Sequence, residues 1–245
     1  MRIMQALLRS LEGHSCPVSG VYVGAFQTAA TTRSTGLAST CRGTHSCSDE
    51  KHGSVREAGQ FLGQDALALA RLSLSEDAVE ASIGLATINS LLAVPESDLQ
   101  TLGAFELLAQ KGRGKNVAVV GHFPFAGRLK DVARNLWIVE RNPQPGDLEE
   151  SEARRVLPDC EVVCLTGTPL TNHTFEDLIA LCPGAYVALV GPTAPLSPVL
   201  FDFGVDAVCG AQVTDAEAVV RHVMQGATFH QIRQAGVRLS TLIKR

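Results

Sequence analysis

Polar side chains and glycines stand directly behind two apolar runs in the second half of the chain. Gly121-His122 follows the first run, and Glu140 and Asn142 follow the second. Glycine lets a backbone approach a ligand closely, and Glu140 lies nineteen positions after Gly121, near the spacing of the ribose-binding acid in dinucleotide-binding folds. Glu140 is therefore a candidate acceptor for the hydroxyl groups of a ligand. The alternative is that its carboxylate ties down its own loop or pairs with Arg141.

Hydroxyl, amide and small residues follow the next two apolar runs. They can present hydrogen-bond donors to an anionic or polar ligand, but they also form ordinary helix caps and turns. Neither G-x-G-x-x-G nor G-x-x-x-x-G-K-[ST] occurs, which disfavours a standard dinucleotide or nucleoside triphosphate site. The candidate ligand-binding residues behind these two runs are Thr166, Gly167, Thr168, Asn172, Gly191 and Pro192.

A candidate acid in the first half, Glu80, begins a helical stretch that is apolar or small nearly all round. A glutamate buried there would need a partner, and its pKa would be perturbed. The alternative is that Glu80 lies near enough to the helix start to be solvated and favoured by the helix dipole. Asn89 is a second candidate, but it lies on roughly the opposite face, so the two residues do not form one site on that helix alone.

Cysteines and histidines gather in a polar stretch of the first half, at Cys41, His45, Cys47 and His52. These ligand types suit Zn²⁺ or another borderline-soft ion. Their spacing, C-x₃-H-x-C-x₄-H, matches no standard zinc module. The sequence therefore supports two interpretations, a metal site or a chance accumulation in a polar loop, and we favour the second.

The elements that must position these residues alternate regularly in the second half. Five short apolar runs are separated by stretches suited to helices, which predicts a parallel, doubly wound sheet. Helix starts are expected at Thr174 with Asp177, at Ser197-Pro198, and at Thr214 with Glu217. The predicted strands are Asn116–Phe123, Trp137–Glu140, Glu161–Leu165, Tyr186–Val190 and Val205–Cys209.

The first half follows a different pattern, with extended segments before helices. Val18–Thr32 and Gly36–Thr40 are expected to be extended, and Gln64–Leu72 and Ser75–Ala93 helical. This order predicts a small α+β unit. We therefore predict an α/β protein in two domains, residues 1–108 as the α+β unit and residues 109–245 as a Rossmann-like domain with a mainly parallel sheet.

Composition narrows the classes of partner. The 245 residues carry a net charge of −4, which disfavours nucleic acid as a partner. The chain contains no run of about 18 apolar residues, so no membrane-spanning helix is predicted. The first twelve residues have helical apolar spacing without a signal-peptide pattern. Seven cysteines, an odd number, are expected to be free thiols, so we expect a cytoplasmic protein. Homo-oligomers are left open.

Several motifs together resemble a family of heavy-metal chelation proteins, previously grouped as a domain of unknown function. The resemblance covers nearly the whole chain and implies an N-terminal domain similar to that of enolase, followed by a Rossmann-like domain. It also implies a site between the two, with Glu80 or Asn89 facing the strand-end residues. The motifs are Glu80-Ala-Ser-Ile-Gly-Leu-Ala with Ile88-Asn-Ser, Gly121-His-Phe-Pro, Val139-Glu-Arg-Asn-Pro with Gly146-Asp, Thr166-Gly-Thr with Asn172-His-Thr, and Gly191-Pro with Pro198 and Leu200-Phe.

Three functions follow from these patterns. The first is binding of a small polar or metal-chelating ligand in the interdomain cleft, with a role in heavy-metal chelation and with enzymatic activity left open. Its ligand could be a transition-metal ion or a pterin-like or nucleoside-like molecule. The second is metal binding or delivery by the Cys/His loop. The third is a transferase that uses a nucleoside-containing cofactor such as S-adenosylmethionine, based on Glu140.

Overall fold

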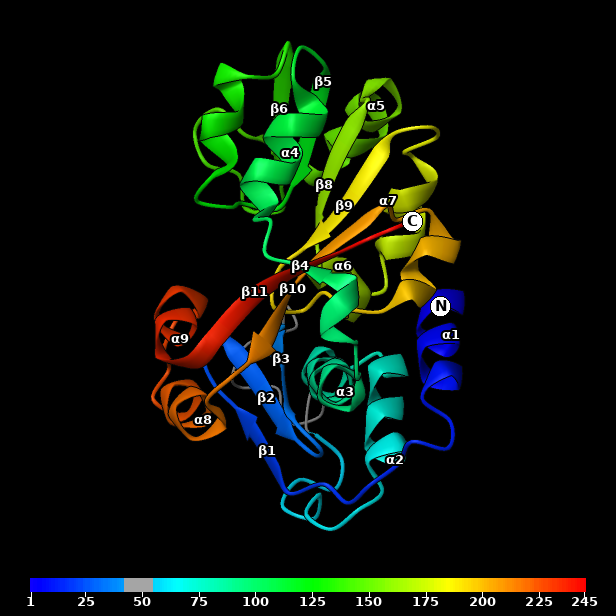
Figure 1. Ribbon diagram of the computed structural model, residues 1–245, viewed down its shortest axis with the longest axis vertical. Coiled ribbons are helices and arrows are strands. Elements are labelled where there is room, and N and C mark those ends of the chain that lie inside the picture. The colour runs from blue at the N-terminus through cyan, green and yellow to red at the C-terminus, as the bar shows by residue number, and fades with distance from the viewer. Residues whose placement is uncertain (42–54) are drawn as a thin grey trace.

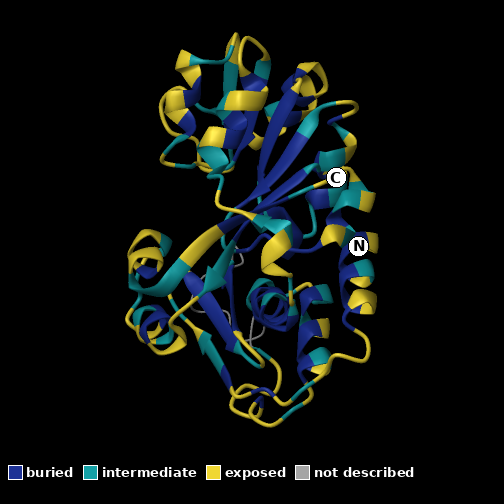
Figure 2. Cartoon of the chain, in the orientation of Figure 1, coloured by how far each residue is buried: buried dark blue, intermediate teal, exposed yellow. Residues whose placement is uncertain are grey.

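The computed structural model describes residues 1–41 and 55–245, which form two sheets flanked by helices (Figure 1). The smaller sheet is antiparallel and has the order β1-β2-β3. The larger sheet has eight strands in the order β4-β11-β10-β9-β8-β5-β6-β7. Several of its central strands are buried along most of their length (Figure 2).

The smaller sheet is built from β1 (Gly20–Val23), β2 (Gln27–Thr31) and β3 (Thr35–Ser39), which are joined by tight turns. One face packs against helix α3 (Ala78–Leu91), which is buried on nearly all sides. Two glycines allow this packing, because a Cβ on Gly84 would lie 1.9 Å from the Ser73 backbone and one on Gly36 2.2 Å from that of Ala86. The apolar character that α3 shows all round its axis thus reflects neighbours on both sides.

Three further segments complete the first half. Helix α1 (Arg2–Ser10) is amphipathic as predicted and packs against the 3₁₀ turn η6 (Pro198–Phe203) of the second half. Helix α2 (Ala66–Ala70) continues into η1 (Arg71–Leu74), and both contact α3.

The larger sheet confirms the α/β class and is mainly parallel. All five predicted strands are present, as β5 (Asn116–Val120), β6 (Asn135–Glu140), β8 (Val162–Thr166), β9 (Tyr186–Val190) and β10 (Ala207–Val213). They pair in parallel with one another. Three strands were not predicted: the parallel edge strand β7 (Leu148–Glu149), and β11 (Val237–Ile243) and β4 (Leu99–Gln100), which are antiparallel.

Helices and 3₁₀ turns connect these strands on both faces. The helix starts are only partly as predicted. Ser197 accepts a hydrogen bond from the Val199 amide, which confirms it as a cap. The Thr174 side chain makes no capping hydrogen bond to α7. Helix α8 is capped by Asp215 instead of Thr214, because the Asp215 carboxylate accepts the Ala218 amide. The connecting helices are α4 (Ala104–Gly112), α5 (Ala153–Val156), α6 (Thr168–Thr171), α7 (Phe175–Ala180), α8 (Ala216–Met224) and α9 (Phe229–Gly236), and the 3₁₀ turns are η2 (Glu96–Asp98), η3 (Ala126–Asp131), η4 (Glu150–Glu152), η5 (Leu157–Asp159) and η6 (Pro198–Phe203).

Segments from the two ends of the chain pack together. Helices α8 and α9 lie beside the smaller sheet (Figure 1), and their buried residues Val219 and Ile232 join Ala29 and Leu37 in one apolar cluster. Strand β4, which precedes residue 108, belongs to the larger sheet. The division into residues 1–108 and 109–245 stays a prediction. No helix among the described residues combines the length and apolarity that a membrane crossing requires.

Candidate functional site

A cavity of about 580 Å³ opens beyond the carboxyl ends of three adjacent strands, β6, β5 and β8. Most of its lining comes from the residues that follow these strands, and the first half adds Cys41 and Ala78. Seven of the predicted ligand-binding residues line it together. They are Gly121, His122, Glu140, Asn142, Thr166, Thr168 and, from the turn after α6, Asn172.

The strand order explains why the cavity lies there. The chain runs from β5 to β6 and β7 on one side, then crosses back to β8, β9 and β10 on the other. Connections diverge at such a switch point and leave a crevice beyond the strand ends, and this order is that of a Rossmann sheet. Gly121 has φ of +105°, and a Cβ there would lie 3.0 Å from the Thr166 side chain. Glycine therefore keeps the crevice open.

The first strand end carries a histidine that is paired with a carboxylate. His122 Nδ1 lies 3.2 Å from Asp147 Oδ2, and the Asp147 side chain is only 5% exposed. The same oxygen accepts a hydrogen bond from the Gln144 amide at 3.0 Å, which fixes the carboxylate. Asp147 follows β6 in the connection to β7, and the sequence patterns did not single it out as a site residue.

The second strand end brings charges of both signs to the cavity. Glu140 Oε1 accepts the Arg141 amide at 2.8 Å, so Glu140 does bond its own loop while it lines the cavity. Arg141 lies 3.8 Å from Glu150, and both side chains are at least half exposed. Such an exposed pair contributes little to stability and can be rearranged by a ligand.

The third strand end and the following turn contribute hydroxyl and amide groups. Thr166 and Thr168 hydroxyls lie 3.3 Å apart. The Asn172 side-chain oxygen Oδ1 accepts a hydrogen bond from the Thr174 hydroxyl at 2.7 Å. No described residue forms a hydrogen bond with the Asn172 Nδ2 group. These groups retain capacity to donate and accept hydrogen bonds.

Cys41 is the only predicted metal ligand among the described residues, because His45, Cys47 and His52 lie outside them. Cys41 lines the cavity. Burial raises the pKa of the Cys41 thiol, although hydrogen bonds with Thr171 and Ser82 and the charge of Arg141 lower it. Within residues 1–41 and 55–245, no three His, Cys, Asp or Glu side chains are arranged to hold a metal ion. The Cys/His site stays a prediction.

Glu80 is buried, as one interpretation required, but it does not line the cavity. Its two oxygens accept the Arg56 amide and guanidinium at 2.8–3.1 Å and the Ser75 hydroxyl at 2.6 Å. The hydrogen bonds from the Arg56 side chain are the main reason why the pKa of Glu80 falls to about 2 in spite of burial. The Ser75 carbonyl in turn lies 2.8 Å from His173 Nε2 of the second half. Glu80 therefore supports the turn that carries Asn172.

Four other candidates also lie away from the cavity lining. Asn89 donates to the Leu37 carbonyl at 2.8 Å and lies 3.4 Å from the carbonyl of Pro192, so it joins the two halves of the molecule. Gly167 packs against the Thr193–Ala194 backbone. Gly191 adopts φ of +121° in the same connection. Asn89 thus ties the connection between β9 and η6 to the first half, and Gly167 packs against the same connection from the end of β8.

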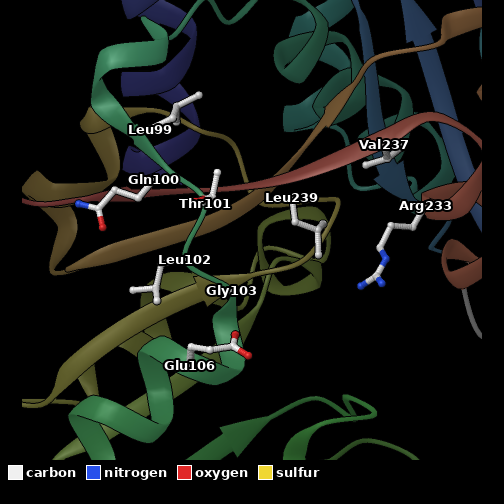
Figure 3. Close-up of a pocket in the computed structure, with 9 residues that line it drawn as sticks. All are labelled: Leu99, Gln100, Thr101, Leu102, Gly103, Glu106, Arg233, Val237 and Leu239. Carbon is white, nitrogen blue, oxygen red and sulfur yellow. The ribbon is translucent and has the colours of Figure 1, made fainter.

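A larger hollow, of about 970 Å³, is lined by residues of β4, β11, α4 and α9 (Figure 3). Its walls carry Glu106 and Arg233 over an apolar floor that includes Leu239. It is wide open, and none of the predicted site residues lines it. The smaller cavity therefore remains the better candidate site.

These features define the class of protein. It is an α/β protein whose larger sheet has the strand order of a Rossmann fold. A cavity lies at the switch point of this sheet, and residues of the smaller α+β half contribute to its lining. A family profile described as "Putative heavy-metal chelation" matches residues 103–240, and a second profile with the same description matches residues 5–92. The chain belongs to this family, DUF364.

Relatives of the chain share its sequence in part and its fold almost completely. An uncharacterized protein of Methanocaldococcus jannaschii is 29% identical over 157 residues, which are 61% of this chain and 61% of that relative. The crystal structure of a DUF364 protein of unknown function from Desulfitobacterium hafniense is 27% identical, covers 99% of this chain and 98% of its own, and has a TM-score of 0.86. A Pyrococcus horikoshii family member has a TM-score of 0.82 at 17% identity over 99% and 98% of the two chains, which shows the fold alone.

Proposed function

We propose that the cavity at the ends of β5, β6 and β8 binds a small polar ligand of the metal-chelating kind. The observation that carries this proposal is the convergence of hydrogen-bonding groups from three strand ends in one cavity of about 580 Å³. Ligand pockets of roughly 300–1,000 Å³ suit small molecules. The family's description as heavy-metal chelation supports the choice of ligand class.

The charges of the cavity indicate what such a ligand should carry. Arg141 can bind an anionic group, while Glu140 and Glu150 accept hydrogen bonds from hydroxyl or amino groups. A chelator with carboxylate and hydroxyl or amino groups offers both. In this proposal a metal ion enters with the chelator as its ligand, and no three described His, Cys, Asp or Glu side chains are arranged to hold one by themselves.

Native mass spectrometry of freshly purified protein, with elemental analysis of the same sample, tests this function. An organic mass that co-purifies would support it and identify the ligand class. Glu140→Ala and Asn172→Ala should then weaken binding of that compound, while Glu217→Gln, at a side chain 91% exposed on α8, should not. Unchanged affinity in both cavity variants would exclude this cavity as the site.

A nucleoside-containing cofactor is the second candidate, and the strand order favours it. Glu140 ends β6, the neighbour of β5, which is where Rossmann folds place the acid that binds the ribose hydroxyls. One Glu140 oxygen is used by the Arg141 amide, and the other has no described hydrogen-bond partner. If this function is right, S-adenosylmethionine or adenosine should raise the melting temperature of the wild type but not of Glu140→Ala. No shift with any nucleoside would count decisively against it.

A further inference from the structure

The pair formed by His122 and Asp147 is a further chemical feature of the cavity. Asp147 is nearly buried and is fixed by the Gln144 amide, whereas the His122 side chain is 39% exposed and lines the cavity. A fixed carboxylate behind an accessible imidazole holds the ring in one orientation. The arrangement thus presents a defined ring nitrogen to whatever occupies the cavity.

The hydrogen bond identifies which nitrogen is available. An ionised carboxylate only accepts hydrogen bonds, so Nδ1, at 3.2 Å from Asp147 Oδ2, carries the hydrogen in the neutral ring. Nε2 then has a lone pair, and no described residue bonds it. Histidines that bind metals are commonly held in this way, with a carboxylate on the other nitrogen.

The remaining donors of the cavity do not complete a metal site. Cys41, Glu140 and Glu150 also line it, yet no three described donors are arranged around one point. His122 differs from these donors because a fixed carboxylate orients its ring.

We propose that His122 Nε2 coordinates a metal ion that enters the cavity already held by an organic chelator, and that Asp147 is the positioning residue for this bond. The inference rests on the proposed function and adds the way in which the protein recognises the ligand. His122 replaces a water molecule on the metal, and the chelator supplies the other bonds. The metal is thus cargo carried by its chelator, and the protein contributes one bond to it.

Nickel nitrilotriacetate is a suitable probe, because this chelator leaves part of the metal's coordination sphere open. Untagged wild-type protein should bind the complex in isothermal titration calorimetry, and His122→Gln should abolish that binding. Asp147→Asn should weaken it about 10-fold, as is usual when the carboxylate behind a metal-binding histidine is changed. His230→Gln is the matched control, because His230 is exposed on α9, away from the cavity lining.

A spectroscopic readout separates coordination from a change of shape. With copper iminodiacetate, pulsed electron paramagnetic resonance should detect imidazole nitrogen in the wild type and in His230→Gln, and lose it in His122→Gln. Circular dichroism of His122→Gln should match that of the wild type. Binding of the chelate that persists in His122→Gln, or absence of binding to the wild type, would overturn the inference.

Two further outcomes are informative. If free Ni²⁺ binds the wild type more tightly than the chelate, and His122→Gln abolishes that binding, the protein builds its own metal site and the inference is wrong. If the chelate does not bind but an organic ligand that depends on Glu140 co-purifies, the inference fails while the proposed function stands. Failure of the proposed function itself is recognised by a co-purified ligand whose affinity does not change in Glu140→Ala and Asn172→Ala.

Discussion

The start of helix α3 and the strand-end cavity both concentrate polar side chains, yet they use them in opposite ways. At α3, both Glu80 oxygens are committed to Arg56 and Ser75, and the side chain is 1% exposed. In the cavity, His122 Nε2 and one Glu140 oxygen have no described partner, and both residues are accessible.

The difference shows that a strongly shifted pKa is a poor guide to function in this protein. The pKa of Glu80 is held near 2 because Arg56 and Ser75 donate hydrogen bonds to its charged form. Such a shift records bonds that are already made, which is also how structural ion pairs behave. The proposed ligand site is marked instead by unused hydrogen-bonding capacity in an accessible hollow.

Replacing Glu80 should cause the largest loss of stability. Glu80→Ala leaves the Arg56 amide and the Ser75 hydroxyl without their acceptor, and we expect a loss of about 2–3 kcal/mol in the free energy of unfolding. Urea denaturation followed by circular dichroism measures this. Glu76→Ala, four residues earlier at an exposed position, is the matched control and should change stability by less than about 0.5 kcal/mol. Equal effects in the two variants would contradict the structural role of Glu80.

The pH dependence of stability should separate Glu80 from other acids. Its pKa is lowered in the folded state, so the stabilisation is present above the ordinary value of 4.5 and is lost as the pH falls toward about 2. Glu80→Gln has no charge to lose. The difference in unfolding free energy between wild type and Glu80→Gln should therefore shrink across that window. A difference that stays constant from pH 5 to pH 2 would show that Glu80 is not held by charge-assisted bonds.

Much of the fold could be predicted because it is encoded locally. The five central strands are continuous apolar runs, the signature of strands buried on both faces. Strand β11 was missed because its buried Ser240 and Thr241 break that pattern. Their hydroxyls donate to Gln212 and to the Leu102 carbonyl, which are far away in the sequence. Strands β4 and β7, with two residues each, are too short to give any pattern.

The candidate site could be predicted to a similar extent and for a similar reason. The carboxyl ends of parallel strands meet at one edge, so Gly121, Glu140 and Thr166 could be grouped without coordinates. The bond between His122 and Asp147 spans 25 positions and depends on how the β6–β7 connection folds back, which no local spacing reveals. For Glu80, a perturbed pKa was expected, but its direction depends on Arg56, 24 positions earlier.

The Gly121→Ala variant tests whether the end of β5, beside the cavity, requires a glycine. Its φ of +105° disfavours any side chain, and a Cβ would press on Thr166 at 3.0 Å, so Gly121→Ala should cost about 1–2 kcal/mol. Gly127→Ala is the control, since that glycine has open space around it and an ordinary φ. Thermal denaturation of both variants measures the difference. A Gly121 variant as stable as the Gly127 variant would mean that the strand end is less constrained than the geometry indicates.

Of the variants considered, Glu140→Gln should change the free energy of unfolding least. It also gives the most direct comparison with Glu80. The glutamine oxygen can still accept the Arg141 amide, and the lost charge faces an accessible cavity, so the free energy of unfolding should change by less than about 0.5 kcal/mol. The affinity for the ligand that co-purifies should nevertheless fall, because an amide accepts hydrogen bonds less strongly than a carboxylate. Glu80→Gln should show the reverse pattern, with a large loss of stability and a smaller change in affinity wherever the protein remains folded. Loss of stability in Glu140→Gln, with no loss of affinity, would show that Glu140 is an anchor of the same kind as Glu80.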